Sequence, residues 1–186
     1  MTQSIITDTD ALPRRGFLSG AAVALLAGGG SLAVSEEAKA GSAAADVRIL
    51  NTALGAEQEA IAAYQVGAES GLLQKPVLDL AVKFQGHHKE HAKVLADTVA
   101  KLGGKPVAPL KRYDFPVDKL KSQADVLTFA AGLEKGAVSA YLGAVPLFQN
   151  RDLAKAAASI LGDEAMHWAV LRGALGLDPV PVAFVS

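Results

Sequence analysis

Apolar residues recur every three or four positions along most of the chain beyond residue 40, a spacing that places them on one side of an α-helix. No stretch alternates apolar and polar residues with the valine, isoleucine and threonine content typical of strands. The periodic stretches therefore predict four helices separated by turn-forming residues. We expect them at about residues 44–69, 76–102, 122–146 and 150–175.

Glycine and serine residues mark the expected helix ends. Ser70-Gly71 follows the first helix and Gly103-Gly104 follows the second. Glycine readily adopts the left-handed conformation that ends helices, so both pairs are suitable stops. At the start of the third helix, the Ser122 hydroxyl can cap the backbone with Asp125 three residues later.

The second and third helices are joined by a long connection, residues 104–121, which contains three prolines and no helical periodicity. A helix of about 26 residues is about 40 Å long, and these 18 residues can reach roughly 60 Å when extended. The connection can therefore cross the whole bundle. With short loops at the other two junctions, the sequence predicts an all-α fold, an antiparallel four-helix bundle with one long crossover.

Composition narrows the class of protein. The chain has 186 residues, 51% hydrophobic and 20% charged, which suits one domain with a sizeable core. Without residues 1–40, 15 basic and 15 acidic residues remain of the original 18 and 19, and no dense lysine and arginine block is present. This balance argues against nucleic acid or a membrane surface as a partner. No cysteine is present, so any metal must be held by histidines and carboxylates.

The first forty residues have the pattern of an export signal. Arg14-Arg15 precedes a mildly hydrophobic run, residues 19–34, as in bacterial twin-arginine (Tat) signals. Ala38 and Ala40 supply the small residues that a signal peptidase reads. We therefore expect a Tat signal peptide at 1–40, a mature domain at 41–186, and a periplasmic or otherwise Tat-exported location. The alternative is an uncleaved membrane anchor, which the glycines at 28–30 disfavour.

The chain contains an internal repeat that carries polar residues. The segment at residues 53–64 reappears at 130–141, and a His-x-x-His motif reappears as Glu-x-x-His. The matched pairs are Glu57 with Glu134, Tyr64 with Tyr141, His88 with Glu164, and His91 with His167. The offset is 77 residues for the first two pairs and 76 for the last two. Two helical hairpins of one design are therefore expected in one chain.

Six of these residues fall on the inward stripes of the four predicted helices, at about the same depth. They are Glu57, His88, His91, Glu134, Glu164 and His167. Burying an ionised carboxylate without a partner costs several kcal/mol, which a divalent metal ion would offset. Carboxylates and imidazoles together suit iron, manganese or zinc. The sequence predicts one or two divalent ions, with iron or manganese favoured and zinc as the alternative.

Three further residues lie near this predicted cluster. His87 is turned about 100° from the inward stripe, so we expect it at the boundary of the site rather than among the ligands. Tyr64 and Tyr141 each follow a predicted ligand glutamate by seven residues. They either orient a ligand carboxylate or are core aromatic residues with their hydroxyls satisfied elsewhere, and both interpretations stay open.

With these motifs, residues 45–175 resemble the ferritin-like superfamily, and within it the Tat-exported bacterial ferritin-like domain proteins related to the desiccation-related group. The family pattern is one glutamate from each of the first and third helices and a Glu-x-x-His from each of the other two, around two metals. The matching residues are Glu57, His91, Glu134, Glu164 and His167. His88 departs from the pattern, because the family has a bridging glutamate there.

The departure at His88 affects the expected chemistry. Four carboxylates neutralise two divalent ions, whereas Glu57, Glu134 and Glu164 supply three negative charges. A single metal or an altered pair is therefore an alternative, and ferroxidase turnover does not follow from the resemblance. At most, we expect a weak ferroxidase or an oxidoreductase that handles peroxide or dioxygen.

The resemblance implies an exported metal-binding protein with a role in protection against oxidative or desiccation stress. Its expected partners are metal ions, with dioxygen or peroxide as candidate substrates, and a homo-oligomer is compatible with the sequence. Two other functions stay open: a non-catalytic bundle with a structural or binding role in the cell envelope, and zinc binding at a single site.

Overall fold

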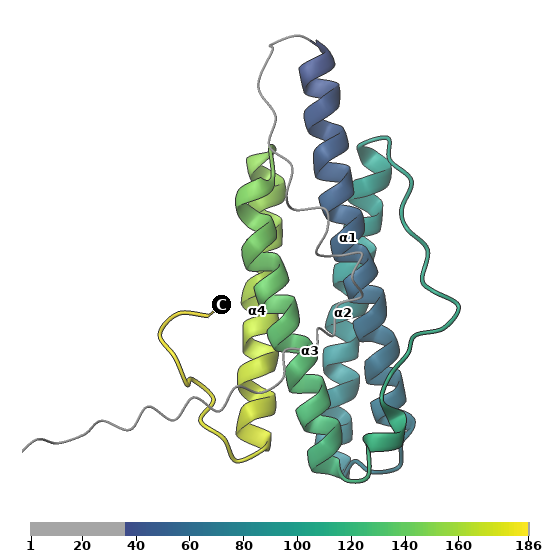
Figure 1. Ribbon diagram of the computed structural model, residues 1–186, viewed down its shortest axis with the longest axis vertical. Coiled ribbons are helices and arrows are strands. Elements are labelled where there is room, and N and C mark those ends of the chain that lie inside the picture. The colour runs from purple at the N-terminus through teal and green to yellow at the C-terminus, as the bar shows by residue number, and fades with distance from the viewer. Residues whose placement is uncertain (1–35, 186) are drawn as a thin grey trace, which may run out of the picture.

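The computed structural model describes residues 36–185 and is all-helical over that range, with no strand (Figure 1). The four long helices are α1 (Glu36–Glu69), α2 (Lys75–Lys101), α3 (Gln123–Ala144) and α4 (Arg151–Ala174), and two short 3₁₀ turns are η1 (Val117–Lys119) and η2 (Val145–Leu147). The predicted signal peptide lies outside the described residues, except for residues 36–40, which belong to α1.

The helix ends follow from local sequence chemistry. Ser122 caps α3 by accepting a hydrogen bond from the Asp125 backbone N–H at 3.2 Å. Gly71 and Gly103, which follow α1 and α2, have φ angles of 70° and 78°, in the left-handed region that glycine tolerates. One boundary differs from expectation, because α1 begins at Glu36 rather than near residue 44. The added segment is rich in alanine, glutamate and lysine, which are good helix formers.

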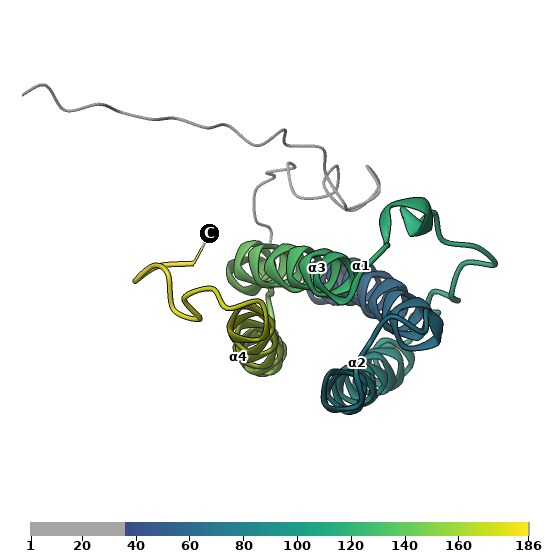
Figure 2. The same ribbon diagram turned by 90° about the horizontal axis from the view of Figure 1, so that it is seen from below.

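The helices form two antiparallel hairpins, α1 with α2 and α3 with α4. Viewed end-on in Figure 2, α1 lies next to α3, and α2 lies on the same side of the bundle as α4. The connection between α2 and α3 runs along the length of the bundle (Figure 1). The predicted four-helix bundle with one long crossover is therefore confirmed.

Side chains of α1 hold the crossover against the bundle. The Asn51 amide donates a hydrogen bond to the Lys105 carbonyl at 3.0 Å and accepts one from the Val107 N–H at 2.8 Å. The Gln58 amide donates to the Val107 carbonyl at 2.9 Å. These bonds satisfy backbone groups of Lys105 and Val107, which belong to no helix.

The apolar core consists of two clusters, one on each side of a polar band at mid-height. One cluster contains Leu50, Leu54, Leu95, Val99 and Ile160, and the other contains Phe84, Leu127, Ala131, Trp168 and Leu171. Each of the four helices contributes to both clusters, so each also passes through the band between them. Between Glu36 and Val185, no helix is both long and apolar enough to cross a lipid bilayer.

Substituting Leu54 with alanine tests the larger part of this core. The Leu54 side chain is 1% exposed, so Leu54→Ala should lower the free energy of unfolding by about 2–5 kcal/mol because it removes packing and leaves a cavity. Denaturant titration measures the loss. The control Val94→Ala, at a residue that is 55% exposed on α2, should cost less than about 0.5 kcal/mol. Equal losses would contradict the assignment of Leu54 to the core.

Candidate metal centre

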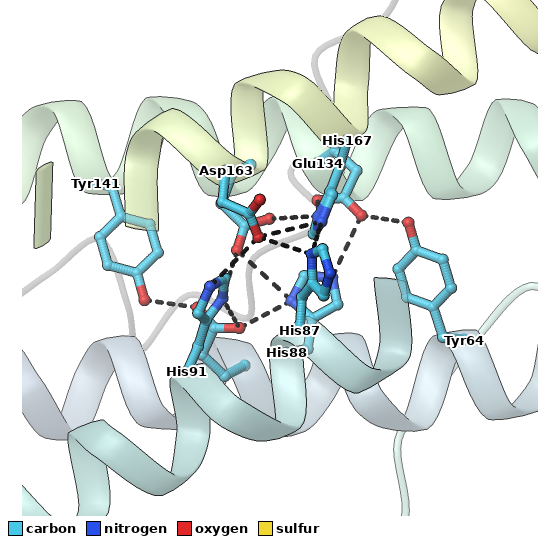
Figure 3. Close-up of polar contacts among 10 residues, drawn as sticks. Tyr64, His87, His88, His91, Glu134, Tyr141, Asp163 and His167 are labelled. Atoms are coloured by element: carbon cyan, nitrogen blue, oxygen red, sulfur yellow. Dashed lines mark hydrogen bonds and ion pairs between the residues drawn. The ribbon is translucent and has the colours of Figure 1, made fainter. Parts of the chain in front are cut away.

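The six predicted site residues converge in the polar band of the bundle (Figure 3). α1, α3 and α4 each supply one glutamate, α2 supplies two histidines and α4 one. Five of the six residues are at most 2% exposed, and the His91 side chain is 15% exposed. The expected convergence is thus observed, while metal binding by these residues stays a prediction.

The six residues form two overlapping groups of potential ligands. The first contains Glu57, His88, His91 and Glu164, and the second contains His88, Glu134, Glu164 and His167. Within each group, one donor atom from each residue lies within 4.8 Å of the others. The two groups share His88 and Glu164, which occupy matching positions of the internal repeat.

Each shared residue presents one atom to each group. Glu164 Oε1 lies 3.1 Å from His91 Nδ1, and its Oε2 lies 3.4 Å from His167 Nδ1. His88 Nδ1 lies 2.8 Å from Glu57 Oε2, and its Nε2 lies 3.3 Å from Glu134 Oε1. Glu164 therefore offers one oxygen to each ligand group, and the imidazole of His88 lies between the glutamates of the two halves.

The two tyrosines hold the carboxylates crosswise. The Tyr141 hydroxyl donates to Glu57 Oε1 at 2.6 Å, and the Tyr64 hydroxyl donates to Glu134 Oε1. Each tyrosine therefore binds the glutamate of the other half of the repeat. Burial and the neighbouring glutamate charges raise the pKa of both tyrosines, so both remain protonated donors. Of the two open interpretations, the orientation of a carboxylate is the one observed.

The cluster pairs opposite charges. Burial by itself would lower the pKa of each buried histidine, but hydrogen bonds to the glutamates and their negative charges outweigh it. The pKa of His88 is raised to about 10, and those of His91 and His167 to about 9. For Glu57 and Glu134, hydrogen bonds to histidines outweigh the effect of burial and lower the pKa. A metal ion must therefore displace protons from the histidines it binds.

Five buried atoms of the cluster make no well-aligned hydrogen bond and meet their neighbours only as ion pairs of 3.1 to 3.6 Å. They are His91 Nδ1, Glu134 Oε2, both carboxylate oxygens of Glu164, and His167 Nδ1. Leaving such a group unsatisfied costs about 1–3 kcal/mol. All five atoms belong to the two ligand groups, and nitrogen and carboxylate oxygen are suitable donors to a divalent ion. The donor set therefore fits a divalent transition metal.

Asp163 is a member of the polar band that the sequence analysis missed. Its Oδ2 lies 3.2 Å from His167 Nε2 and 3.4 Å from His91 Nε2, the ring nitrogens that point away from Glu164. A carboxylate at this nitrogen favours a proton there, which leaves Nδ1 free to bind a metal. The repeat held the signal, because Asp163 follows His87 by 76 residues, the offset that relates Glu164 to His88.

His87 lies at the edge of the site, as expected. Its side chain is 34% exposed, and its Nδ1 lies 3.0 Å from Asp163 Oδ2 and 2.9 Å from His167 Nε2. Two adjacent histidines of α2, His87 and His88, thus face the adjacent acids Asp163 and Glu164 of α4.

Comparisons with known proteins agree with the four-helix fold. The sequence profile of a family described as the ferritin-like domain matches residues 45–177. Among solved structures, that of a conserved hypothetical protein from Mycobacterium tuberculosis superposes with a TM-score of 0.67 at 22% sequence identity, covering 77% of this chain and 99% of that one. This likeness shows a shared fold. No curated protein matches the chain.

Replacing Tyr141 with phenylalanine tests the crosswise contacts. Tyr141→Phe removes the donor to buried Glu57, so the free energy of unfolding in the presence of chelator should fall by about 1–3 kcal/mol. Denaturant titration measures this change. The control is Tyr113→Phe, whose hydroxyl accepts a hydrogen bond only from the exposed backbone of Leu110. A loss at Tyr141 no larger than at Tyr113 would contradict the proposed contact.

Proposed function

Because the chain belongs to the ferritin-like domain family, we propose that it is an exported metal-binding protein that holds one or two divalent ions inside the bundle. The observation that carries the proposal is the set of five buried nitrogen and oxygen atoms between the helices that make no well-aligned hydrogen bond. Iron or manganese is the favoured metal, because the donors are carboxylates and imidazoles without a thiolate.

The residues present suit two adjacent ions. Glu57 and His91 would hold one ion, Glu134 and His167 the other, and Glu164 offers one oxygen to each. Tyr64 and Tyr141 fix the carboxylates of Glu134 and Glu57 by hydrogen bonds before any ion arrives. A bound redox-active metal would supply electron transfer to dioxygen or peroxide.

The histidine at position 88 limits the expected reactivity. Three buried carboxylates carry three negative charges, and two divalent ions carry four positive ones. Oxidation of the ions would add positive charge, which the buried carboxylates would compensate poorly inside the bundle. We therefore propose a protein that is at most a weak ferroxidase or an oxidoreductase handling peroxide or dioxygen. The alternative is a single ion held among the six cluster residues.

Export and a role in stress protection complete the proposal, and they rest on the sequence. The pair Arg14-Arg15 and the small residues Ala38 and Ala40 support a Tat signal. The Tat pathway carries folded proteins, which allows a metal to be inserted before export to the periplasm. A metal site that handles peroxide or dioxygen there would protect against oxidative or desiccation stress.

Metal analysis of the protein purified from the periplasm tests this function. The wild type should contain one or two ions per chain in the buried cluster, and Glu164→Gln should contain less metal than the wild type because it removes the negative charge shared by both groups. Glu90→Gln is the matched control, since Glu90 is exposed on α2. The proposal fails if the wild type holds no stoichiometric metal, or if Glu164→Gln retains as much metal as the control.

A non-catalytic bundle with a structural or binding role in the cell envelope is the second candidate. The observation that favours it is the pairing of three buried carboxylates with three histidines, which balances charge without a metal; the pairs join Glu57, Glu134 and Glu164 to His88, His91 and His167. Melting of the metal-free protein separates the two functions. Metal binding to the native state should raise the melting temperature, with about 2.7 kcal/mol of stabilisation when free metal is a hundredfold above Kd.

An unchanged melting temperature with Fe(II), Mn(II) and Zn(II) would instead support the structural role. Binding of a single zinc would show one tightly held ion and no oxygen consumption when Fe(II) is added.

A further inference from the structure

A second set of donor atoms lies beside the buried cluster, between α2 and α4 and nearer to the solvent (Figure 3). It consists of His87, Asp163 and the outward-facing Nε2 of His167. The His87 side chain is 34% exposed and that of Asp163 is 21% exposed, whereas His167 is 2% exposed. This outer set therefore links the solvent to the buried cluster.

The distances in the outer set suit a metal ion. His87 Nδ1 lies 2.9 Å from His167 Nε2 and 3.0 Å from Asp163 Oδ2, and His167 Nε2 lies 3.2 Å from Asp163 Oδ2. Donors bound at 2.0–2.1 Å around a tetrahedral ion are roughly 3.3 Å apart. Small movements of the side chains would therefore admit an ion. Two imidazoles and a carboxylate suit zinc, iron or another divalent transition metal.

Two histidines connect the outer set to the buried cluster. His167 directs Nε2 to Asp163 and Nδ1 to Glu164, at 3.2 and 3.4 Å. His91 likewise has Nε2 at 3.4 Å from Asp163 and Nδ1 at 3.1 Å from Glu164. Each imidazole ring thus points one nitrogen at Asp163 and the other at the buried cluster. An ion bound at the outer set is therefore separated from the buried carboxylates by one imidazole ring.

We propose that His87, Asp163 and His167 form an outer binding site for one divalent transition-metal ion, which captures the ion from solvent and passes it to the buried cluster. The passage inward rests on the proposed function, while the capture of an ion does not. Solvent reaches the partly exposed His87 and Asp163, so water can complete the coordination of the captured ion. While Nε2 of His167 holds the captured ion, its Nδ1 carries the ring proton; when the ion moves inward, a proton returns to Nε2 beside Asp163, and Nδ1 is free to bind the ion near Glu164.

The competing interpretation is that Asp163 only positions the rings of His91 and His167. Under that interpretation, His87 and Asp163 would bind no ion of their own once the buried cluster is disabled. The variant Glu164→Gln disables the buried cluster and leaves all three outer residues intact. It therefore allows the outer site to be measured alone.

The experiment measures Zn(II) bound to the purified protein by equilibrium dialysis and elemental analysis, in the wild type, in Glu164→Gln and in Glu164→Gln with His87→Gln. Glu164→Gln should retain one Zn(II), and adding His87→Gln should weaken its binding by about tenfold or more.

Co(II) gives a second readout, because the visible absorption of the Glu164→Gln complex should disappear in the double variant. Asp163→Asn in place of His87→Gln should have the same effect, and Asp97→Asn, an exposed acid on α2 paired only with Lys93, should have none.

Each comparison reports on one proposal. Equal metal content in the wild type and Glu164→Gln would overturn the proposed buried centre. Loss of all metal from Glu164→Gln, or unchanged binding in the double variant, would overturn the outer site. In the protein with Glu164 intact, His87→Gln should also take up Zn(II) more slowly than Asp97→Asn, and equal uptake rates in the two variants would contradict capture at the outer site.

Discussion

The buried carboxylate of Glu164 sets the main constraint on this bundle. It is 0% exposed, and neither of its oxygens makes a well-aligned hydrogen bond. A carboxylate in that position is very costly unless positive charge surrounds it. His88, His91 and His167 all lie within 3.6 Å of it and supply that charge as imidazolium groups, or hold a metal ion that supplies it.

The same constraint ties the two halves of the repeat together. Tyr141 from the second half binds Glu57 of the first, and Tyr64 binds Glu134 in return. Each of these two glutamates therefore takes its tyrosine hydrogen bond from the other hairpin. The hairpins associate to bury their apolar faces, and the polar band fixes the register in which they do so, because a shift of one helix would leave charged groups unpaired.

His88 and Asp163 show how this chain departs from a symmetric repeat. Where the second half has adjacent acids, Asp163 and Glu164, the first half has the adjacent imidazoles His87 and His88. The imidazoles of α2 and the carboxylates of α4 therefore attract each other across the bundle. They meet in the buried cluster, where His88 lies near Glu164, and at its edge, where His87 lies near Asp163. With histidine rather than glutamate at position 88, one carboxylate fewer can bind metal ions. His87 and Asp163 add a set of donor atoms near the solvent.

The sequence by itself determined the helices, the crossover and the inward position of the six cluster residues. This is possible because helix periodicity, capping residues and glycine stops are local, and because burial follows from the spacing of residues such as Glu57 and His91 along one helix. Only the tertiary structure decided that Tyr64 binds Glu134 and that Asp163 joins the site. The spacing along a helix fixes which face a residue occupies, but the packing of the hairpins decides which residue of another helix lies opposite it.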